Sequence, residues 1–281
     1  MTVAILPAIK SHPFSCKVII IAEKTMANFI LTEIEERAHG KVARLAIDNQ
    51  RKLNTLNTAV IKEFAETMDR LDEDKDIAVL VITGAGNKSF IGGADINLMA
   101  GLDPESAREF ITSIHMTCHK ARFFHAPVIA RVNGFCLGAG MELAAACDIV
   151  VAGKSASFAM PEVRVGIPSV VEAALLPKIL GLNLARDLVM TGRSINAEEA
   201  YTAGLVQRLC EDEALDAATE TAIEEILEGG RNAMAIQKQL CNDWENNALE
   251  DGIQMGIDAF ARAYESDEPG RMMGAFINRP R

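Results

Sequence analysis

The sequence predicts an α/β core followed by a mostly helical C-terminal third. Three largely apolar runs have the length of strands that are buried on both faces of a parallel sheet: IAVLVIT (77–83), PVIARVNG (127–134) and DIVVAG (148–153). Predicted helices lie between these runs. With 281 residues, of which 49% are hydrophobic and 24% charged, the chain is long enough for one large domain or two small ones.

The first elements predicted along the chain are a β-hairpin and a helix. The segment FILTEIEERAHGKVARLAIDN (29–49) alternates apolar and polar residues around His39-Gly40, as two paired strands do. A helix is expected from about Thr58 to Leu71. Its apolar residues recur at helical spacing: Val60, Ile61, Phe64, Ala65 and Met68.

Later elements are predicted by caps and by a change of pattern. A second helix begins at Asp103-Pro104, where an N-cap acid precedes a proline at the first helical position. From about Ala197 the pattern is helical, broken by one short strand at GLVQRL (204–209). Residues 1–25 contain one short apolar run and no signal-peptide cleavage site, so we expect a poorly packed N-terminal extension.

Composition limits the class of function. A net charge of −11 disfavours a nucleic-acid surface, which needs a basic face. No apolar stretch reaches the roughly 18 residues of a membrane span. The six cysteines are scattered without a C-x-x-C pair, which is typical of reduced thiols in a cytoplasmic protein. We therefore expect a cytoplasmic protein with no nucleic-acid or membrane partner.

Two glycine-rich turns follow the strand predicted at 77–83. VITGAGNKSF (81–90) is similar to a phosphate-binding P-loop, but Asn87 separates Gly86 from Lys88, and the loop requires Gly-Lys-Ser/Thr. Turn glycines are the better interpretation. SFIGGADI (89–96) has two consecutive glycines that allow positive φ and leave a following N–H free to face a cavity.

A third glycine-rich turn, GFCLGAGMELAAACD (134–148), opens a predicted helix. Its spacing does not match the G-x-G-x-x-G of dinucleotide-binding folds. The first N–H groups of a helix lack intrahelical partners and carry the positive end of its dipole. This turn therefore predicts a donor site for one negative atom, an oxyanion rather than a pyrophosphate.

Two carboxylates are candidates for acid–base chemistry beside that donor. Glu142 falls in the first helical turn, where it would also be an ordinary dipole-stabilised acid. Glu162 follows Pro161 and would otherwise be an exposed loop acid. The intervening chain can return Glu162 to the side of Glu142, and burial would then separate the two pKa values.

Other polar residues have simpler interpretations. His115 and His119 lie four apart on a predicted helix with His125 beyond, yet the sequence between them lacks a zinc-protease pattern, so helix-face histidines are favoured over a metal site. SVVE (169–172) matches a capping box, which predicts a structural role for Glu172. The tail EPGRMMGAFINRPR (268–281) contains three arginines and is either phosphate-binding or a solvated end.

These segments together resemble the crotonase (enoyl-CoA hydratase/isomerase) superfamily over about residues 28–281. The resemblance is strongest to its enoyl-CoA hydratases. The matching blocks, in order, are DNQRKLNTLN, SFIGGADINLM, PVIARVNGFCLGAGMELAAACDIVVAG, ASFAMPEVRVGIP, LVMTGRSINAEEAYTAGLV and GAFINRP. The resemblance implies a spiral of ββα units over residues 26–196. A mainly helical region over residues 197–281 would build homotrimers, often paired into hexamers.

The resemblance also implies the chemistry. Family members bind acyl-CoA and polarise the thioester carbonyl with two backbone N–H groups, matched here by Ala94 and Ala139. Hydratases carry two glutamates: Glu142 would activate water for attack on C3, and Glu162 would deliver a proton to C2. Coenzyme A belongs to the substrate, and neither a separate cofactor nor a metal is expected. The CoA-binding residues implied are Arg51, Lys52, Gly92, Asp95, Ile96 and Arg279.

Three departures from the family pattern leave other reactions open. Asn97 replaces a lysine after GADI, and Ala139 stands where glycine is commonest. PSVVEAALLP (168–177) replaces the usual glycine-rich PGAGGTQRL, with one residue fewer upstream. Branched Val170 and Val171 would narrow the acyl pocket, change the substrate or change the reaction. The alternatives are an acyl-CoA hydrolase, an enoyl-CoA isomerase, or a non-catalytic CoA-binding or scaffold protein.

Overall fold

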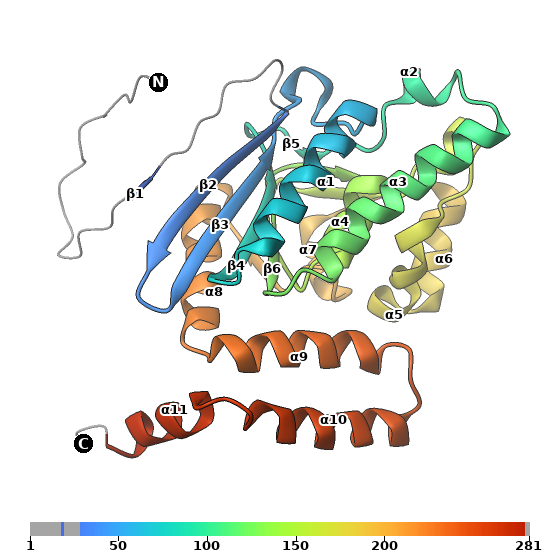
Figure 1. Cartoon of the computed structure of the whole chain (residues 1–281). Coiled ribbons are helices and arrows are strands. Elements are labelled where there is room, and N and C mark those ends of the chain that lie inside the picture. Colours follow the sequence, from blue (N-terminus) through green and yellow to red (C-terminus); the bar gives the residue numbers. More distant parts are fainter. Residues whose placement is uncertain (1–17, 20–28, 279–281) are drawn as a thin grey trace.

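The computed structural model describes residues 18–19 and 29–278. Within these ranges seven strands form the larger sheet, in the order β1-β2-β3-β4-β6-β8-β11, and four form a smaller sheet, β10-β9-β7-β5 (Figure 1). In the larger sheet the β1–β2 and β2–β3 pairs are antiparallel and the others are parallel. Apart from β1 (Val18–Ile19), which pairs with β2, the extension expected over residues 1–25 lies outside the described residues.

The predicted hairpin and first helix are confirmed. β2 (Ile30–Arg37) and β3 (Gly40–Ile47) pair from Arg37↔Gly40 outwards, and β3 then runs parallel to β4 (Ile77–Gly84). α1 (Thr58–Glu73) ends two residues beyond the predicted Leu71. Its N-cap, Asn57, accepts hydrogen bonds from the first free N–H groups, those of Ala59 and Val60.

After α1, the chain alternates between the two sheets. β4 belongs to the larger sheet and β5 (Ser89–Ile91) to the smaller; α2 (Ile96–Met99) and α3 (Pro104–Arg122) follow. β6 (Val128–Val132) and β7 (Phe135–Leu137) repeat the step before α4 (Ala139–Ala146). β8 (Ile149–Gly153) and β9 (Ser157–Ala159) repeat it again. This succession is the expected spiral of ββα units.

The chain after β9 returns to the larger sheet once. Short elements come first: η2 (Glu162–Val165), η3 (Val171–Leu175), α5 (Leu176–Leu180), α6 (Leu182–Thr191), β10 (Ser194–Asn196) and α7 (Ala197–Thr202). The strand expected in GLVQRL is β11 (Arg208–Cys210), which pairs in parallel with β8. Helices α8 (Leu215–Leu227), α9 (Arg231–Trp244), α10 (Leu249–Ala263) and α11 (Glu268–Ile277) complete the chain.

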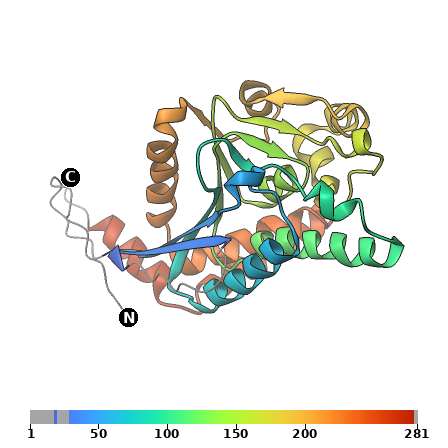
Figure 2. The same cartoon turned by 90° about the horizontal axis from the view of Figure 1, so that it is seen from above.

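Helices cover both faces of the larger sheet. α8 packs its apolar side against one face, where Val42, Val81 and Val151 are buried. α1, α3 and α4 lie over the other face and enclose the main core (Figures 1 and 2). The Asp103 cap predicted for α3 is confirmed, since Asp103 and Ser106 bond each other's backbone N–H groups. α3 also contacts α4 directly, so the two helices lie side by side in the core.

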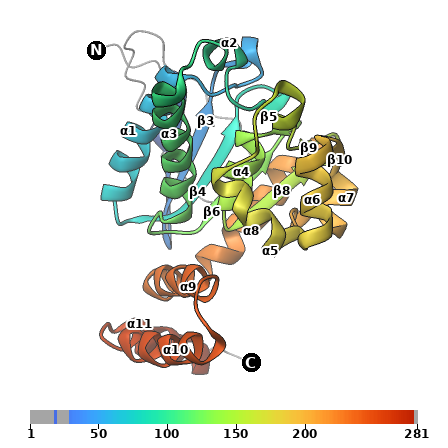
Figure 3. The same ribbon diagram turned by 90° about the vertical axis from the view of Figure 1, so that its right-hand side faces the viewer.

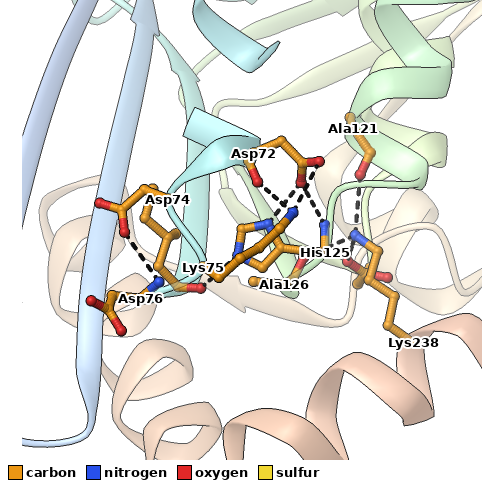
Figure 4. A network of polar contacts seen from close by, with 10 residues as sticks. Asp72, Asp74, Lys75, Asp76, Ala121, His125, Ala126 and Lys238 are labelled. Atoms are coloured by element: carbon orange, nitrogen blue, oxygen red, sulfur yellow. Dashed lines mark hydrogen bonds and ion pairs between the residues drawn. The ribbon is translucent and has the colours of Figure 1, made fainter. Parts of the chain in front are cut away.

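α9 and α10 lie below this body (Figure 3). Lys238 of α9 is only 6% exposed, and its ammonium donates to the carbonyls of Ala121 and Ala126 and lies 2.8 Å from Asp148 Oδ2 (Figure 4). His125 lies beside it, with Nδ1 2.7 Å from Asp72 Oδ1. A buried ammonium with three oxygen partners is fully compensated, so this contact anchors α9 to the end of α3.

No helix in the described ranges, 18–19 and 29–278, is both long enough and apolar enough to cross a membrane.

Candidate active site

Two glycine turns from the smaller sheet lie against each other. Gly138, between β7 and α4, has φ of +51°, and Gly93, after β5, has φ of +100°. A Cβ placed on Gly138 would lie 4.0 Å from the Gly93 Cα and would collide with Oε1 of Glu162. Glycine is therefore favoured at Gly138 by the positive φ, and a side chain there would also displace the Glu162 carboxylate from its position.

This contact brings Ala94 and Ala139, the expected oxyanion donors, to neighbouring turns. Ala139 is the first residue of α4, where an N–H has no intrahelical acceptor. Ala94 forms an isolated parallel bridge with Leu56. In that bridge Leu56 bonds to the Gly93 carbonyl and to the Asp95 N–H, so the Ala94 N–H points to the opposite side.

Glu142 is a buried carboxylate in the first turn of α4. Only 4% of the residue is exposed. Its Oε1 accepts a 3.1 Å hydrogen bond from the Ala173 N–H, and the same N–H also donates to the Val170 carbonyl. Burial in the core raises the pKa of Glu142 to about 8, and the nearby carboxylates of Glu162 and Glu172 add to the rise. The Glu142 carboxyl group therefore ionises in the mildly alkaline range, near pH 8.

Glu162 occupies a more open position. It is the first residue of η2, just after β9, and its Oε2 accepts a 2.7 Å hydrogen bond from the Ser169 hydroxyl. The capping box predicted for residues 169–172 is therefore wrong, because the N-cap of η3 is Val170 and the Ser169 side chain is engaged by Glu162. Glu162 lies against Gly138, the residue before α4, and near enough to Glu142 to raise its pKa; the intervening chain allowed this return.

Glu172 is a third carboxylate in this region, and its local sequence did not predict its surroundings. It is 6% exposed, and its Oε1 lies 2.7 Å from Nδ1 of His115 on α3. The partnership joins residues 57 apart in the chain, so no short motif could have indicated it. Ser169 and His115 are thus the polar partners of the site that sequence reasoning missed.

Most of the residues proposed for CoA binding are gathered at one edge. The segments around Lys52 and Asp95 run side by side, because Gly92 donates its N–H to the Leu53 carbonyl and Lys52 Nζ lies 2.7 Å from Asp95 Oδ2. Arg51 is exposed in η1 (Gln50–Lys52), and the Ile96 side chain is 58% exposed at the start of α2. Arg279 lies outside the described residues.

Two positions that depart from the family pattern lie near the site. The backbone N–H of Asn97, which a lysine would also provide, donates to the capping carboxylate of Asp95 at the start of α2, so this contact does not depend on the substitution. In the 168–177 loop, Val171 has φ of +42°, which is unusual for a β-branched residue and indicates strain. Within residues 18–19 and 29–278, no cluster of three or more His, Cys, Asp or Glu side chains could hold a metal ion.

Comparisons with known proteins agree with this architecture. The family model for enoyl-CoA hydratase/isomerase matches residues 37–280. The chain is 34% identical to a crotonyl-CoA hydratase from Syntrophomonas wolfei, over 89% of this chain and 95% of that protein. It is 32% identical to a short-chain-enoyl-CoA hydratase from Clostridium acetobutylicum, over 85% of this chain and 92% of that protein.

A solved structure is similar over nearly the same length. The enoyl-CoA hydratase from Bacillus anthracis superposes with a TM-score of 0.83 at 29% identity, covering 89% of this chain and 96% of that one. The family match over residues 37–280 runs from the end of β2 through α11. By both sequence and structure, this chain belongs to the enoyl-CoA hydratase/isomerase family.

Proposed function

We propose that this protein hydrates a 2-enoyl-CoA thioester to the 3-hydroxyacyl-CoA. The observation that carries the proposal is the approach of Glu162 to Gly138, at the start of the helix that carries the buried Glu142, whose pKa the Glu162 charge raises. Relatives at 32–34% identity are named for this reaction with short-chain substrates. Hydration needs one group to remove a proton from water and one to supply a proton to carbon, and two carboxylates can divide that work.

The oxyanion hole is assigned to the N–H groups of Ala94 and Ala139. When water adds at C3, negative charge develops on the thioester oxygen, and donors already fixed in the backbone stabilise that charge without reorganising. Each such donor is worth about 3–4 kcal/mol in the transition state. The positive end of the α4 dipole at Ala139 acts in the same direction.

The two glutamates then move the protons. Ionised Glu142 takes a proton from water as the water oxygen bonds to C3. The resulting enolate collapses and takes a proton at C2 from the carboxylic acid form of Glu162, whose Oε2 accepts a hydrogen bond from the Ser169 hydroxyl. The proton gained by Glu142 then passes through solvent to Glu162, which restores both groups for the next turnover. A base with a pKa of about 8 is strong when ionised, and a substantial fraction of it is ionised in mildly alkaline solution.

The substrate's CoA portion is assigned to the edge formed by Arg51, Lys52, Gly92, Asp95 and Ile96, with Arg279 as a further phosphate ligand. The exposed Arg51 guanidinium is available for a phosphate, whereas Lys52 is paired with Asp95 and has to share its charge. The reaction requires no separate cofactor.

The strained 168–177 loop keeps acyl-CoA hydrolysis and double-bond isomerisation as competing reactions, since it borders both glutamates.

We also propose that the protein is a homo-oligomer, a trimer or a dimer of trimers, and that it works in the cytoplasm. α10 presents an apolar stripe at helical spacing that is more than half exposed in the single chain: Leu249, Ile253, Ile257 and Phe260. Contiguous exposed apolar surface of this kind is typical of an interface between protein chains.

Replacing either glutamate by its amide should abolish hydration. Glu142→Gln and Glu162→Gln preserve size and remove the acid–base group, so we expect kcat to fall by at least about two decades in each. Loss of the conjugated thioester absorbance of crotonyl-CoA measures the rate. A matched variant, Glu109→Gln on the exposed face of α3, should retain the wild-type rate. Near-normal hydration by either site variant would remove that residue from the mechanism.

Burial of Glu142 should make the folded protein less stable as the pH rises. Because its pKa is raised from 4.5 to about 8 in the folded state, the folded protein keeps a proton that the unfolded chain loses above pH 4.5; the resulting stability is fully present below pH 4.5 and is lost as the pH rises through 8. Glu142→Gln resembles the protonated form, so it should exceed the wild type in stability by at least about 1 kcal/mol at pH 9, with a much smaller difference at pH 5. Urea unfolding at both values, with Glu109→Gln as the control, measures the effect. If the difference in unfolding free energy between Glu142→Gln and the wild type does not grow from pH 5 to pH 9, burial does not destabilise the ionised Glu142 carboxylate.

The apolar stripe on α10 should carry the assembly. We expect sedimentation velocity to show three or six chains for the wild type. Ile257→Lys places a charge in the stripe and should dissociate the assembly, whereas Gln254→Lys, on a polar face of the same helix, should leave it intact. A monomeric wild type would contradict the proposal.

A further inference from the structure

A buried carboxylate that the proposed mechanism does not use lies beside Glu142. Glu172 is 6% exposed, and its Oε2 is buried without a hydrogen bond of normal geometry among the described residues, although the weakly donating Cys118 thiol approaches the carboxylate. Its Oε1 is held by Nδ1 of His115 at 2.7 Å. A buried carboxylate oxygen without a strong hydrogen bond lowers stability, so packing alone does not explain this side chain.

The backbone around Glu172 connects it directly to Glu142. The next residue, Ala173, donates its N–H to Glu142 Oε1, and the preceding residue, Val171, has the strained φ of +42°. This conformation turns Glu172 inward while the adjacent N–H binds the catalytic carboxylate. Strain at a β-branched residue persists only where the surroundings impose it.

His115 forms the outer end of the same arrangement. Its side chain is 43% exposed, whereas the side chain of Glu172 is 7% exposed. An ionised carboxylate only accepts hydrogen bonds, so Nδ1 of His115 carries the hydrogen when Glu172 is ionised. A hydrogen-bonded connection therefore leads from the surface of α3 to the segment that holds Glu142.

We infer that His115 and Glu172 form a positioning pair for Glu142, in which His115 orients Glu172, and the negative charge of Glu172 and the adjacent Ala173 N–H together set the protonation of the catalytic base. The inference rests on the proposed function. It assigns His115 and Glu172 no contact with substrate; both act through Glu142.

Other charged groups around Glu142 are few. Glu162 faces it from η2 and Glu172 from η3. The Cys118 thiol, 1% exposed on α3, lies near both Glu142 and Glu172, whose charges raise its pKa further above the value that burial imposes. His119 is one turn beyond His115 and packs on Phe123. From α5, Lys178 directs its ammonium away, to the Glu245 carbonyl. Glu172 is therefore the charge on η3 whose removal should be felt at Glu142.

The first test compares the pH dependence of kcat/KM for crotonyl-CoA in the wild type and in Glu172→Gln. The acidic limb reports ionisation of the base in the free enzyme. Removing a neighbouring negative charge lowers the pKa of Glu142, so the limb should move at least about half a pH unit towards lower pH. Glu109→Gln removes an exposed carboxylate of α3 and should leave the limb in place. A lower rate with an unmoved limb would reduce Glu172 to a structural residue and overturn the inference.

A double-mutant cycle tests whether His115 acts through Glu172. His115 is partly exposed, so His115→Gln is expected to fold even if Glu172→Gln does not. His115→Gln should move the limb in the wild-type background and have no further effect in the Glu172→Gln background. Additive shifts, or no shift for His115→Gln alone, would contradict the proposed pair.

Direct titration separates this inference from the proposed function. The carboxyl ¹³C resonance of Glu142 is assigned by its loss in Glu142→Gln. The change of its chemical shift with pH gives the midpoint of Glu142 ionisation without any substrate. If the wild type does not hydrate crotonyl-CoA, the proposed function fails, and the inference still stands or falls on this midpoint. A midpoint that falls in Glu172→Gln supports the pair, and an unchanged midpoint overturns it.

Discussion

The close approach of α4 to the smaller sheet is the constraint on which the rest of the site depends. A Cβ on Gly140 would collide with the Ile91 carbonyl of β5, so the start of α4 can lie against β5 only because residue 140 is glycine. With α4 in that place, Gly138 meets Gly93, and Ala139 and Ala94 end up on adjoining turns. Glu142, one helical turn after Gly138, is then buried in the core.

The same packing explains the unusual electrostatics. Glu142 and Glu172 are each buried in a region where desolvation penalises charge, and Glu162 lies near enough to Glu142 to raise its pKa further. Burying neighbouring carboxylates lowers the stability of the fold, which is typical of functional sites. The surrounding chain offsets part of the cost with fixed donors: Ala173 for Glu142, Ser169 for Glu162 and His115 for Glu172.

Local sequence predicted the elements well and the polar partnerships poorly. The hairpin around His39-Gly40, the start of α3 at Asp103-Pro104 and the strand in GLVQRL follow from alternation, capping and apolar runs, which are local signals. The meeting of Glu142 and Glu162 was a hypothesis from spacing and from family resemblance. Whether each performs its expected step remains a prediction.

The capping-box error has a physical reason. A serine hydroxyl can serve a nearby N–H or a distant carboxylate, and local sequence does not show which one is within reach. At Ser169 the carboxylate of Glu162 is within reach because β9 and η2 return it to the loop. The pairing of His115 with Glu172 depends in the same way on α3 packing against η3, which no short motif records.

The identity of the product tests the central claim most directly. The protein would be incubated with crotonyl-CoA in H₂¹⁸O, and the products would be separated and identified by mass spectrometry. Hydration through a water activated by Glu142 predicts 3-hydroxybutyryl-CoA with one ¹⁸O at C3 and no free CoA. Free CoA with labelled crotonate, or an alkene shifted to another carbon without label, would contradict the account and assign the two glutamates to a different thioester reaction.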